Sequence, residues 1–367
     1  MALQGSGQIS ASQIANEFGY NHPISGTQSG NEVSLGTYRK VGFSQSNYPQ
    51  SIGALNFSSI DGGGSVPTSG QIKFSDFYGT RLQTVVNFWS SGAGGNRLVA
   101  KDRYNENGNI GVHGHVAVVG GFRSRPNNSS GTKVHIHVNQ QIGSEKTRVE
   151  HCALRTGSWD SSTTLQVDVG GSGRIGGAGG DGGTGAGGGG TPAAEGGESG
   201  TSGLGIQYNP TTVNVASGGV ITAGFGGGGG GGGAYDTDKE ATRTSSGGGG
   251  GGGAGVPPGA GGGVNANAGV NGGPGNAGTI SEGGAGGPRA NNDGEAISGE
   301  GGDGGEATQA AGSGVTGTGG EGSTYGGGCL AGADGAAIRK SQSGFTVNVN
   351  IASSGTVNGV QNATTVL

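Results

Sequence analysis

The chain has 367 residues, 95 of them glycine, and a formal net charge of −5 at pH 7. This length allows two or three domains, and no basic stripe of the kind that binds nucleic acid is visible. The two cysteines, Cys152 and Cys329, are too few and too far apart for a disulfide framework or a metal knuckle.

Targeting and membrane signals are also missing from the sequence. The first ten residues, MALQGSGQIS, lack the charged region and the apolar region of a secretory signal. No apolar run approaches the roughly 20 residues that a membrane-spanning helix needs. We therefore expect a soluble chain that is made in a cytoplasm and leaves the cell by another route, such as assembly into a virion.

Residues 1–81 contain an internal echo, because GQISASQIANEFG at Gly7–Gly19 returns as GQIKFSDFYG at Gly70–Gly79. In the first copy Ser10 stands where a helix N-cap is expected, and Gln13 stands three residues later, which together make a capping box. The pattern predicts a small helix-containing N-terminal module that carries no chemistry of its own.

Three short motifs in this module carry a resemblance to a known class of protein. They are SGQISASQIANEFG at Ser6–Gly19, SLGTYR at Ser34–Arg39 and SGQIKFSDFYG at Ser69–Gly79. This arrangement resembles the leader of many virion structural proteins of tailed phages, marine cyanophages especially, in which the leader precedes variable fibre or adhesin regions. The resemblance covers about 80 residues and implies that residues 1–81 attach the chain to other virion proteins.

Residues 82–169 have the composition of an all-β domain. Segments rich in valine, isoleucine, threonine and aromatic residues alternate with glycine, asparagine and serine turns. This spacing predicts a small β-sandwich or barrel. The strand-like segments are Leu82–Trp89, His115–Phe122, Lys133–Asn139 and Thr163–Val169.

Four of the six histidines form two pairs of the type H-x-H, His113 with His115 and His135 with His137. On a strand, residues two apart point to the same face, so each pair is also explained by plain polar alternation. In a homotrimer, as phage fibre and spike proteins often are, one pair per chain would supply six nitrogens for iron or nickel on the axis. Gly114 leaves room for close approach, so His113 and His115 are the candidate metal ligands.

Residues 170–340 hold 68 of the glycines, and in Gly170–Gly190 a glycine begins each of seven consecutive triplets. A period of three is the period of the polyproline-II helix. Collagen is disfavoured because proline is scarce and the register breaks, and a flexible linker is the remaining alternative. We expect a bundle of polyglycine-II rods in which backbone bonds to backbone. Further triplet runs begin at Gly269, Gly299 and Gly314.

The polar segments between glycine runs are expected to be displayed loops, and loops on a rigid scaffold are where binding residues concentrate. The glycine-rich part is similar in composition to the polyglycine-II domains of some phage tail-tip adhesins, whose loops carry host specificity. The expected loops are Thr191–Asn214, Ala234–Ser246 and Pro288–Ser298. The candidate receptor-contact residues in the last two are Tyr235, Asp236, Asp238, Lys239, Arg243, Asn291 and Asn292.

The tail, residues 341–367, alternates apolar and polar residues over Gly344–Val360, with a turn at Ser353–Gly355. This pattern predicts a β-hairpin that packs on the β domain or on another subunit. No glycine run is followed by G-K-[ST], and no nucleophile has a supporting histidine and acid nearby, so we expect neither nucleotide binding nor catalysis.

Together these patterns predict a mainly β virion protein with a polyglycine-II-like bundle. The expected role is a tail-fibre or receptor-binding component that contacts a host surface glycan or an outer-membrane protein. The alternative is a purely structural virion component, such as a capsid decoration, neck or tail-wall protein, without receptor contact.

Overall fold

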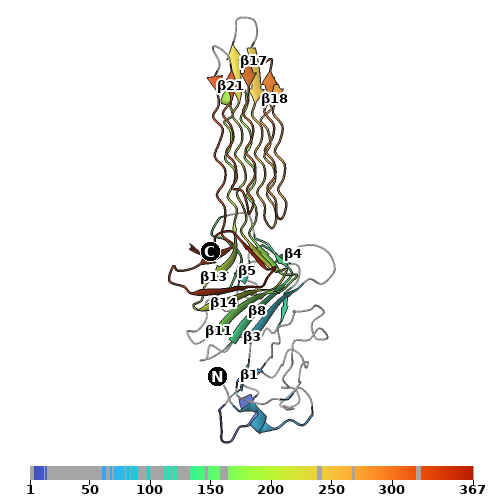
Figure 1. Ribbon diagram of the computed structural model, residues 1–367, viewed down its shortest axis with the longest axis vertical. Coiled ribbons are helices and arrows are strands. Elements are labelled where there is room, and N and C mark those ends of the chain that lie inside the picture. Colours follow the sequence, from blue (N-terminus) through green and yellow to red (C-terminus); the bar gives the residue numbers. More distant parts are fainter. Residues whose placement is uncertain are drawn as a thin grey trace.

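The computed structural model describes a base made of three β-sheets and a long stalk that rises from it (Figure 1). None of the helices among the described residues is long and apolar enough to cross a membrane. The described residues are 4–11, 13–14, 60–62, 67, 70–78, 80–82, 84–89, 97–99, 111–112, 114–116, 119–121, 133–144, 148–157, 164–237, 242–266, 269–319 and 324–366.

The base is a parallel β-solenoid, in which the chain runs through three strands per coil and each strand pairs in parallel with its equivalent in the next coil. The first coil has β8 (Lys133–Asn139), β9 (Gln141–Ile142) and β10 (Cys152–Arg155), the second β11 (Thr164–Val169), β12 (Arg174–Gly176) and β13 (Ser202–Ile206), the third β14 (Thr211–Val215), β15 (Val220–Thr222) and β23 (Ile338–Lys340), and the fourth β24 (Val347–Ile351), β25 (Thr356–Asn358) and β26 (Ala363–Thr364).

The N-terminal strands extend these sheets beyond the first coil. β3 (Thr84–Trp89) pairs in parallel with β8, whereas the other pairs at this end are antiparallel. The remaining strands there are β4 (Arg97–Val99), β5 (Gly111–Val112), β6 (Gly114–Val116) and β7 (Val119–Gly121), and a separate pair is formed by β1 (Ile60–Gly62) and β2 (Thr80–Leu82).

One apolar core fills the space between the three sheets. Because the coils are in register, equivalent residues stack directly on one another, as Ile142, Ile175 and Ile221 do in neighbouring strands. All three side chains are fully buried in the same cluster. Burying an aliphatic side chain of this size contributes roughly 1.5–3 kcal/mol, so these stacks hold the coils together.

The stalk is inserted into the second and third coils of the base. Two rods connect β12 to β13, and eight rods connect β15 to β23. We number the ten rods of the described residues in chain order, and odd and even rods run in opposite directions. They are rods 1 (177–187), 2 (193–201), 3 (223–233), 4 (247–255), 5 (259–266), 6 (271–279), 7 (283–290), 8 (298–305), 9 (311–317) and 10 (326–336).

Backbone hydrogen bonds join the rods at every third residue. The N–H of Gly228 donates to the carbonyl of Gly251 at 2.8 Å, and three residues on the N–H of Gly231 donates to Gly248 at 2.8 Å. By such bonds rod 3 is surrounded by rods 1, 2, 4, 8, 9 and 10, and rod 4 by rods 1, 3, 5, 6, 7 and 8. The bundle is therefore a small hexagonal lattice with rods 3 and 4 at its two centres.

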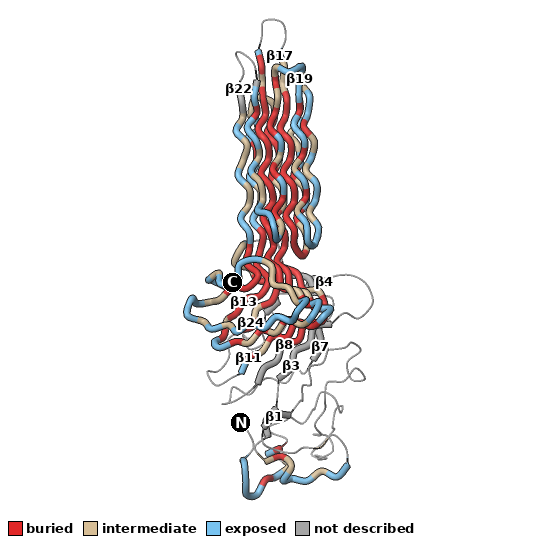
Figure 2. The backbone as a smooth tube through the Cα atoms, viewed as in Figure 1, coloured by how far each residue is buried: buried red, intermediate tan, exposed pale blue. Residues whose placement is uncertain are grey.

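The position of a rod in this lattice explains its glycine content. A central rod has backbone on every side, and a Cβ added at Gly228 would lie 2.0 Å from the carbonyl oxygen of Gly302. The two uninterrupted glycine runs of the sequence are these central rods. Rods 1 and 8 have one open side and carry a larger residue at every third position, such as Thr184 and Asp303. Figure 2 shows the buried centre and the exposed outer rods.

The predicted fold class is wrong in two respects. No helix of seven or more residues occurs among the described residues, so the predicted helix-containing module is not seen. The capping contacts themselves form, since the N–H of Ser10 donates to Oε1 of Gln13 at 2.7 Å, but residues 15–59 lie outside the description. The β domain is a parallel solenoid because its strands pair between coils, so the predicted sandwich or barrel is wrong as well.

The predicted C-terminal hairpin is also wrong. β24 pairs in parallel with β14, and β25 pairs in parallel with β15, so these two strands of the tail belong to different sheets. The turn at Ser353–Gly355 is a corner of the solenoid, and residues 341–366 complete the fourth coil of the base.

Candidate functional site

The connections at the far end of the stalk gather into one structure, which we call the tip (Figure 1). It consists of a four-stranded sheet in the order β18-β17-β16-β22, a three-stranded sheet in the order β19-β20-β21, and the short turn η3. These elements are η3 (Gly188–Gly190), β16 (Ala234–Thr237), β17 (Thr242–Ser246), β18 (Val270–Asn271), β19 (Asn291–Asn292), β20 (Ala296–Ile297), β21 (Thr318–Gly319) and β22 (Thr324–Tyr325).

Arg243 of β17 holds the two sheets of the tip together. Its guanidinium forms an ion pair with the carboxylate of Glu295, and its Nε lies 3.7 Å from Oδ2 of Asp293. In addition, Nδ2 of Asn292 donates to the carbonyl of Thr244 at 3.2 Å. The β16–β17 hairpin and the β19–β20 turn therefore form one surface, although they are far apart in the sequence.

The β19–β20 turn is fixed by its backbone. Asp293 has φ 55° and Gly294 has φ 81°, so both adopt the left-handed conformation that asparagine, aspartate and glycine tolerate best. The N–H of Gly294 donates to Oδ1 of Asn291 at 2.8 Å. The turn therefore holds the exposed carboxylate of Asp293 in a defined place.

Tyr235 packs against the turn of η3. Gly189 has φ 70°, and a Cβ added there would lie 3.1 Å from Cβ of Tyr235, so the turn needs glycine for its conformation and for space. Tyr235 itself is half-buried in β16. The tyrosine therefore anchors one edge of the tip and also presents part of its surface to solvent.

The structure brings most of the predicted contact residues together at the tip. Asn291 is exposed, and Asn292 and Arg243 are half-buried. Asp236 is buried, with 2% of its surface exposed, and its Oδ1 has no hydrogen-bond partner among the described residues, so Asp236 is not a surface contact. Asp238 and Lys239 lie outside the described residues.

The predicted loop Thr191–Asn214 is wrong. Only Thr191 and Pro192 lie at the far end of the stalk. Residues 193–201 form rod 2, and residues 202–214 include β13 and most of β14. Sequence reasoning also missed Asp293 and Glu295. The Asp293–Gly294 pair was the signal that could have found this turn.

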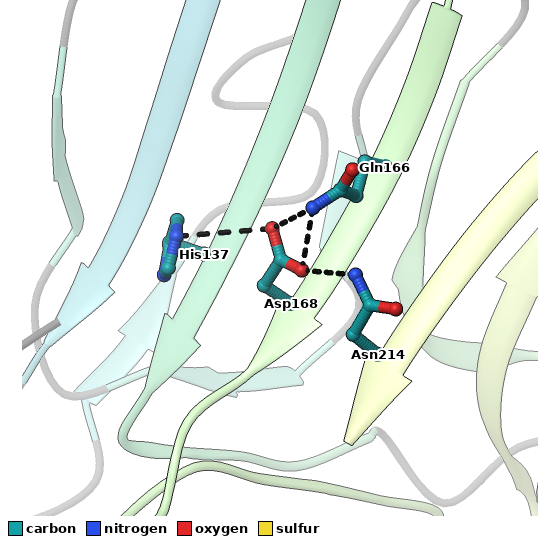
Figure 3. A network of polar contacts seen from close by, with 4 residues as sticks. All are labelled: His137, Gln166, Asp168 and Asn214. Atoms are coloured by element: carbon teal, nitrogen blue, oxygen red, sulfur yellow. Dashed lines mark hydrogen bonds and ion pairs between the residues drawn. The ribbon is translucent and has the colours of Figure 1, made fainter. Parts of the chain in front are cut away.

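Three of the four paired histidines, His115, His135 and His137, lie in strands of the base. His113 is outside the described residues, and for His115 only the backbone in β6 is described. Among the described residues no group of three metal-ligating side chains is found. His137 is buried in β8, and its Nε2 lies 3.8 Å from Oδ2 of Asp168, as Figure 3 shows.

Asp168 is the centre of a polar ladder on the outer face of this sheet. It accepts hydrogen bonds from Nε2 of Gln166 at 2.8 Å and from Nδ2 of Asn214 at 2.6 Å (Figure 3). Asn214 in turn accepts from Nδ2 of Asn350 at 2.8 Å. These bonds run across β11, β14 and β24, so the ladder fixes the register of the coils.

The tip can bind by hydrogen bonds, by ion pairs and by contact with an aromatic ring.

The buried thiol of Cys152 lies in the base, where burial raises its pKa from 9.0 to about 12. A thiol with this pKa stays protonated at neutral pH, and thiolate chemistry at Cys152 is therefore disfavoured.

Comparison with known proteins found no matching family model, no matching curated protein and no matching solved structure.

Proposed function

We propose that the chain is a virion structural protein of a tailed phage and that its tip is the receptor-binding surface of a host adhesin. In this proposal residues 1–81 attach to other virion proteins. The stalk holds the tip away from the particle, and the tip contacts a glycan or an outer-membrane protein of the host. The chain has no catalytic role in this account.

The observation that carries the proposal is the collection of polar connections at one end of a rigid scaffold. The turns at the base end of the bundle are short, namely residues 256–258, 280–282 and 306–310. The connections at the far end instead build two small sheets with polar and charged side chains. Binding residues concentrate on loops that a rigid framework positions.

The chemistry of the tip suits a polar receptor. Tyr235 offers part of an aromatic ring, Asn291 offers an exposed amide, and Asp293 offers an exposed carboxylate. Aromatic rings beside hydrogen-bonding groups are what a sugar or a polar protein loop requires for recognition.

The test exchanges tip segments and leaves the rods intact. Residues 238–241, 293–295 and 320–323 are each replaced by glycine and serine, and the control replaces the base-end turn 280–282 in the same way. The readout is adsorption of assembled particles to host cells. We expect at least one tip exchange to reduce adsorption while particle yield stays unchanged, and the control exchange to have no effect. Unchanged adsorption in all three tip exchanges would favour the purely structural alternative.

A further inference from the structure

The fourth coil is the last coil that the structure describes, and its outer edge is unpaired there. Among the described residues β24, β25 and β26 are the last strands of their sheets. Residues 341–367 contain no aspartate, glutamate, lysine, arginine or histidine. Monomeric proteins usually protect a sheet edge with charges, proline or a bulge, and the charges and the proline are absent here.

The backbone of β24 is oriented for pairing at this edge. The carbonyl of Thr346 accepts from the N–H of Thr211 at 3.2 Å, and the N–H of Ala352 donates to Val215 at 2.9 Å. In a parallel ladder every second residue bonds to one neighbour, so the odd-numbered residues turn away from β14. The residues whose N–H and C=O groups point to the free edge are Val347, Val349 and Ile351.

This edge is complementary to itself. An antiparallel copy centred on Val349 places Val347 opposite the partner's Ile351 and Asn348 opposite the partner's Asn350. The first pair lies on the face of the core, where Val347 and Val349 pack, and the second lies on the face of the polar ladder. Apolar residues therefore meet apolar residues, amides meet amides, and no charges repel.

Exposed apolar side chains mark the same flank of the stalk. Val315 of rod 9 is 54% exposed and Leu330 of rod 10 is 78% exposed. Rods 1 and 3 continue β12 and β15, so the step from rod 1 to rod 3 follows the solenoid from the second coil to the third. Rod 9 bonds to rods 3 and 10 and lies on the opposite side of rod 3 from rod 1. It is therefore on the side of the bundle that faces the fourth coil. In Figure 1 rod 10 and the strands of the fourth coil, which are coloured red, lie on one flank of the molecule.

We propose that this flank binds a second copy of the chain. The interface consists of the fourth coil together with Val315 and Leu330, and β24 pairs with the partner's β24 about a twofold axis perpendicular to their sheet. The stalk leaves the base at the corner between the other two sheets, so this axis keeps both stalks on the same side. A dimer of this form presents two tips in one direction, and two linked sites bind a surface more tightly than one. The proposal does not depend on the receptor function.

The test measures the mass of the full chain in solution by light scattering at concentrations up to about 100 µM. Val349→Pro removes an N–H that points to the free edge, a position where a monomer tolerates proline. Leu330→Lys places a charge at an exposed site on the outer face of rod 10. The matched control is Ile280→Lys, because Ile280 is also exposed, at 40%, but lies in a base-end turn.

We expect a mass of twice 35.1 kDa for the unmodified chain and for Ile280→Lys. Dimer formation should weaken by about tenfold or more in Leu330→Lys and Val349→Pro, with unchanged circular dichroism. A monomeric mass for the unmodified chain would overturn the proposal. A dimer that neither variant weakens, or that Ile280→Lys weakens equally, would overturn it too.

Discussion

At the centre of the stalk each glycine is required by the backbone of the neighbouring rods. A Cβ at Gly228 would lie 2.0 Å from a carbonyl oxygen, whereas a Cβ at Gly327 of rod 10 would meet no atom within 4 Å. Real Cβ atoms do not approach backbone oxygens to 2 Å, so the lattice would have to move apart at Gly228. The same substitution at these two glycines therefore tests the packing around each one, because only the neighbouring backbone differs.

We predict that Gly228→Ala destabilises the stalk and that Gly327→Ala does not. Overpacking of a tightly packed interior typically costs about 1–3 kcal/mol, and the short distance at Gly228 places this variant at or above the upper end. The measurement is the denaturation midpoint of each variant. Equal midpoints for the two variants would mean that the rods are not packed as described.

A second prediction concerns Cys152 and alkaline pH. Its thiol ionises near pH 9.0 when unfolded, but burial raises the folded pKa to about 12. The contribution of the protonated Cys152 thiol to the free energy of unfolding is therefore fully present below pH 9. It is lost as the pH rises toward 12, because the unfolded chain ionises first. At about pH 10.5 the loss is about 2 kcal/mol, at 1.36 kcal/mol for each pH unit.

The measurement compares urea unfolding of the unmodified chain and of Cys152→Ala at pH 8 and pH 10.5. The variant should lose less stability between the two pH values, because it has no thiol to ionise in the unfolded state. The same loss in both proteins would contradict the burial of this thiol.

At the scale of the elements, the polar ladder and the stacked aliphatic residues fix which strands pair. Asp168 accepts hydrogen bonds from Gln166 and Asn214, whereas Asn350 stands at the exposed end of the ladder. Removing the buried carboxylate of Asp168 leaves two half-buried donors without their acceptor, which costs about 1–3 kcal/mol, whereas the exposed amide of Asn350 is replaced by water at much lower cost.

We therefore predict that Asp168→Ala lowers the free energy of unfolding by about 1–3 kcal/mol and that Asn350→Ala lowers it by less than about 0.5 kcal/mol. Chemical denaturation of the two variants checks this difference. If Asn350→Ala costs as much as Asp168→Ala, the ladder does not have the buried centre that we describe.

The sequence predicted structure that depends on neighbouring residues, and it did not predict which strands pair when they lie far apart in the sequence. The threefold phase of glycine in rod 1 indicated rods, because each rod needs only its own period. The solenoid was missed because the third coil is split, with rods 3–10 between β15 and β23. The strands of the tail read as a hairpin because Ser353–Gly355 forms a turn, but turn residues do not say which strand is the partner.

The candidate site shows the same limit. Polar residues between glycine runs marked Ala234–Ser246 and Pro288–Ser298, and both segments lie at the tip. Thr191–Asn214 was also predicted as a polar loop between glycine runs, and it contains Glu195 and Glu198. These glutamates occupy every third position of a rod with an open outer side, where side chains are tolerated. Charge between glycines therefore marks either a loop or an outer rod, and only the lattice distinguishes them.

At the scale of the whole molecule, the stalk has to be ordered in order to hold the tip away from the base (Figure 1). A chain with this glycine content loses a large conformational entropy on folding, roughly 1–2 kcal/mol for each residue. The hydrogen bonds between rods and the close packing of backbone against backbone have to offset this cost. Rods 3 and 4 have rods on all sides, so we expect them to open last.

The most direct test of this claim is amide hydrogen exchange over residues 223–233 and 247–255. These segments donate hydrogen bonds to neighbouring rods along their length and have no route to water except by opening of the bundle. We predict that they are the slowest-exchanging amides of the stalk, slower than those of the outer rod 6. Exchange of both segments at random-coil rates would contradict the account, because it would show that the glycine-rich region is a flexible linker.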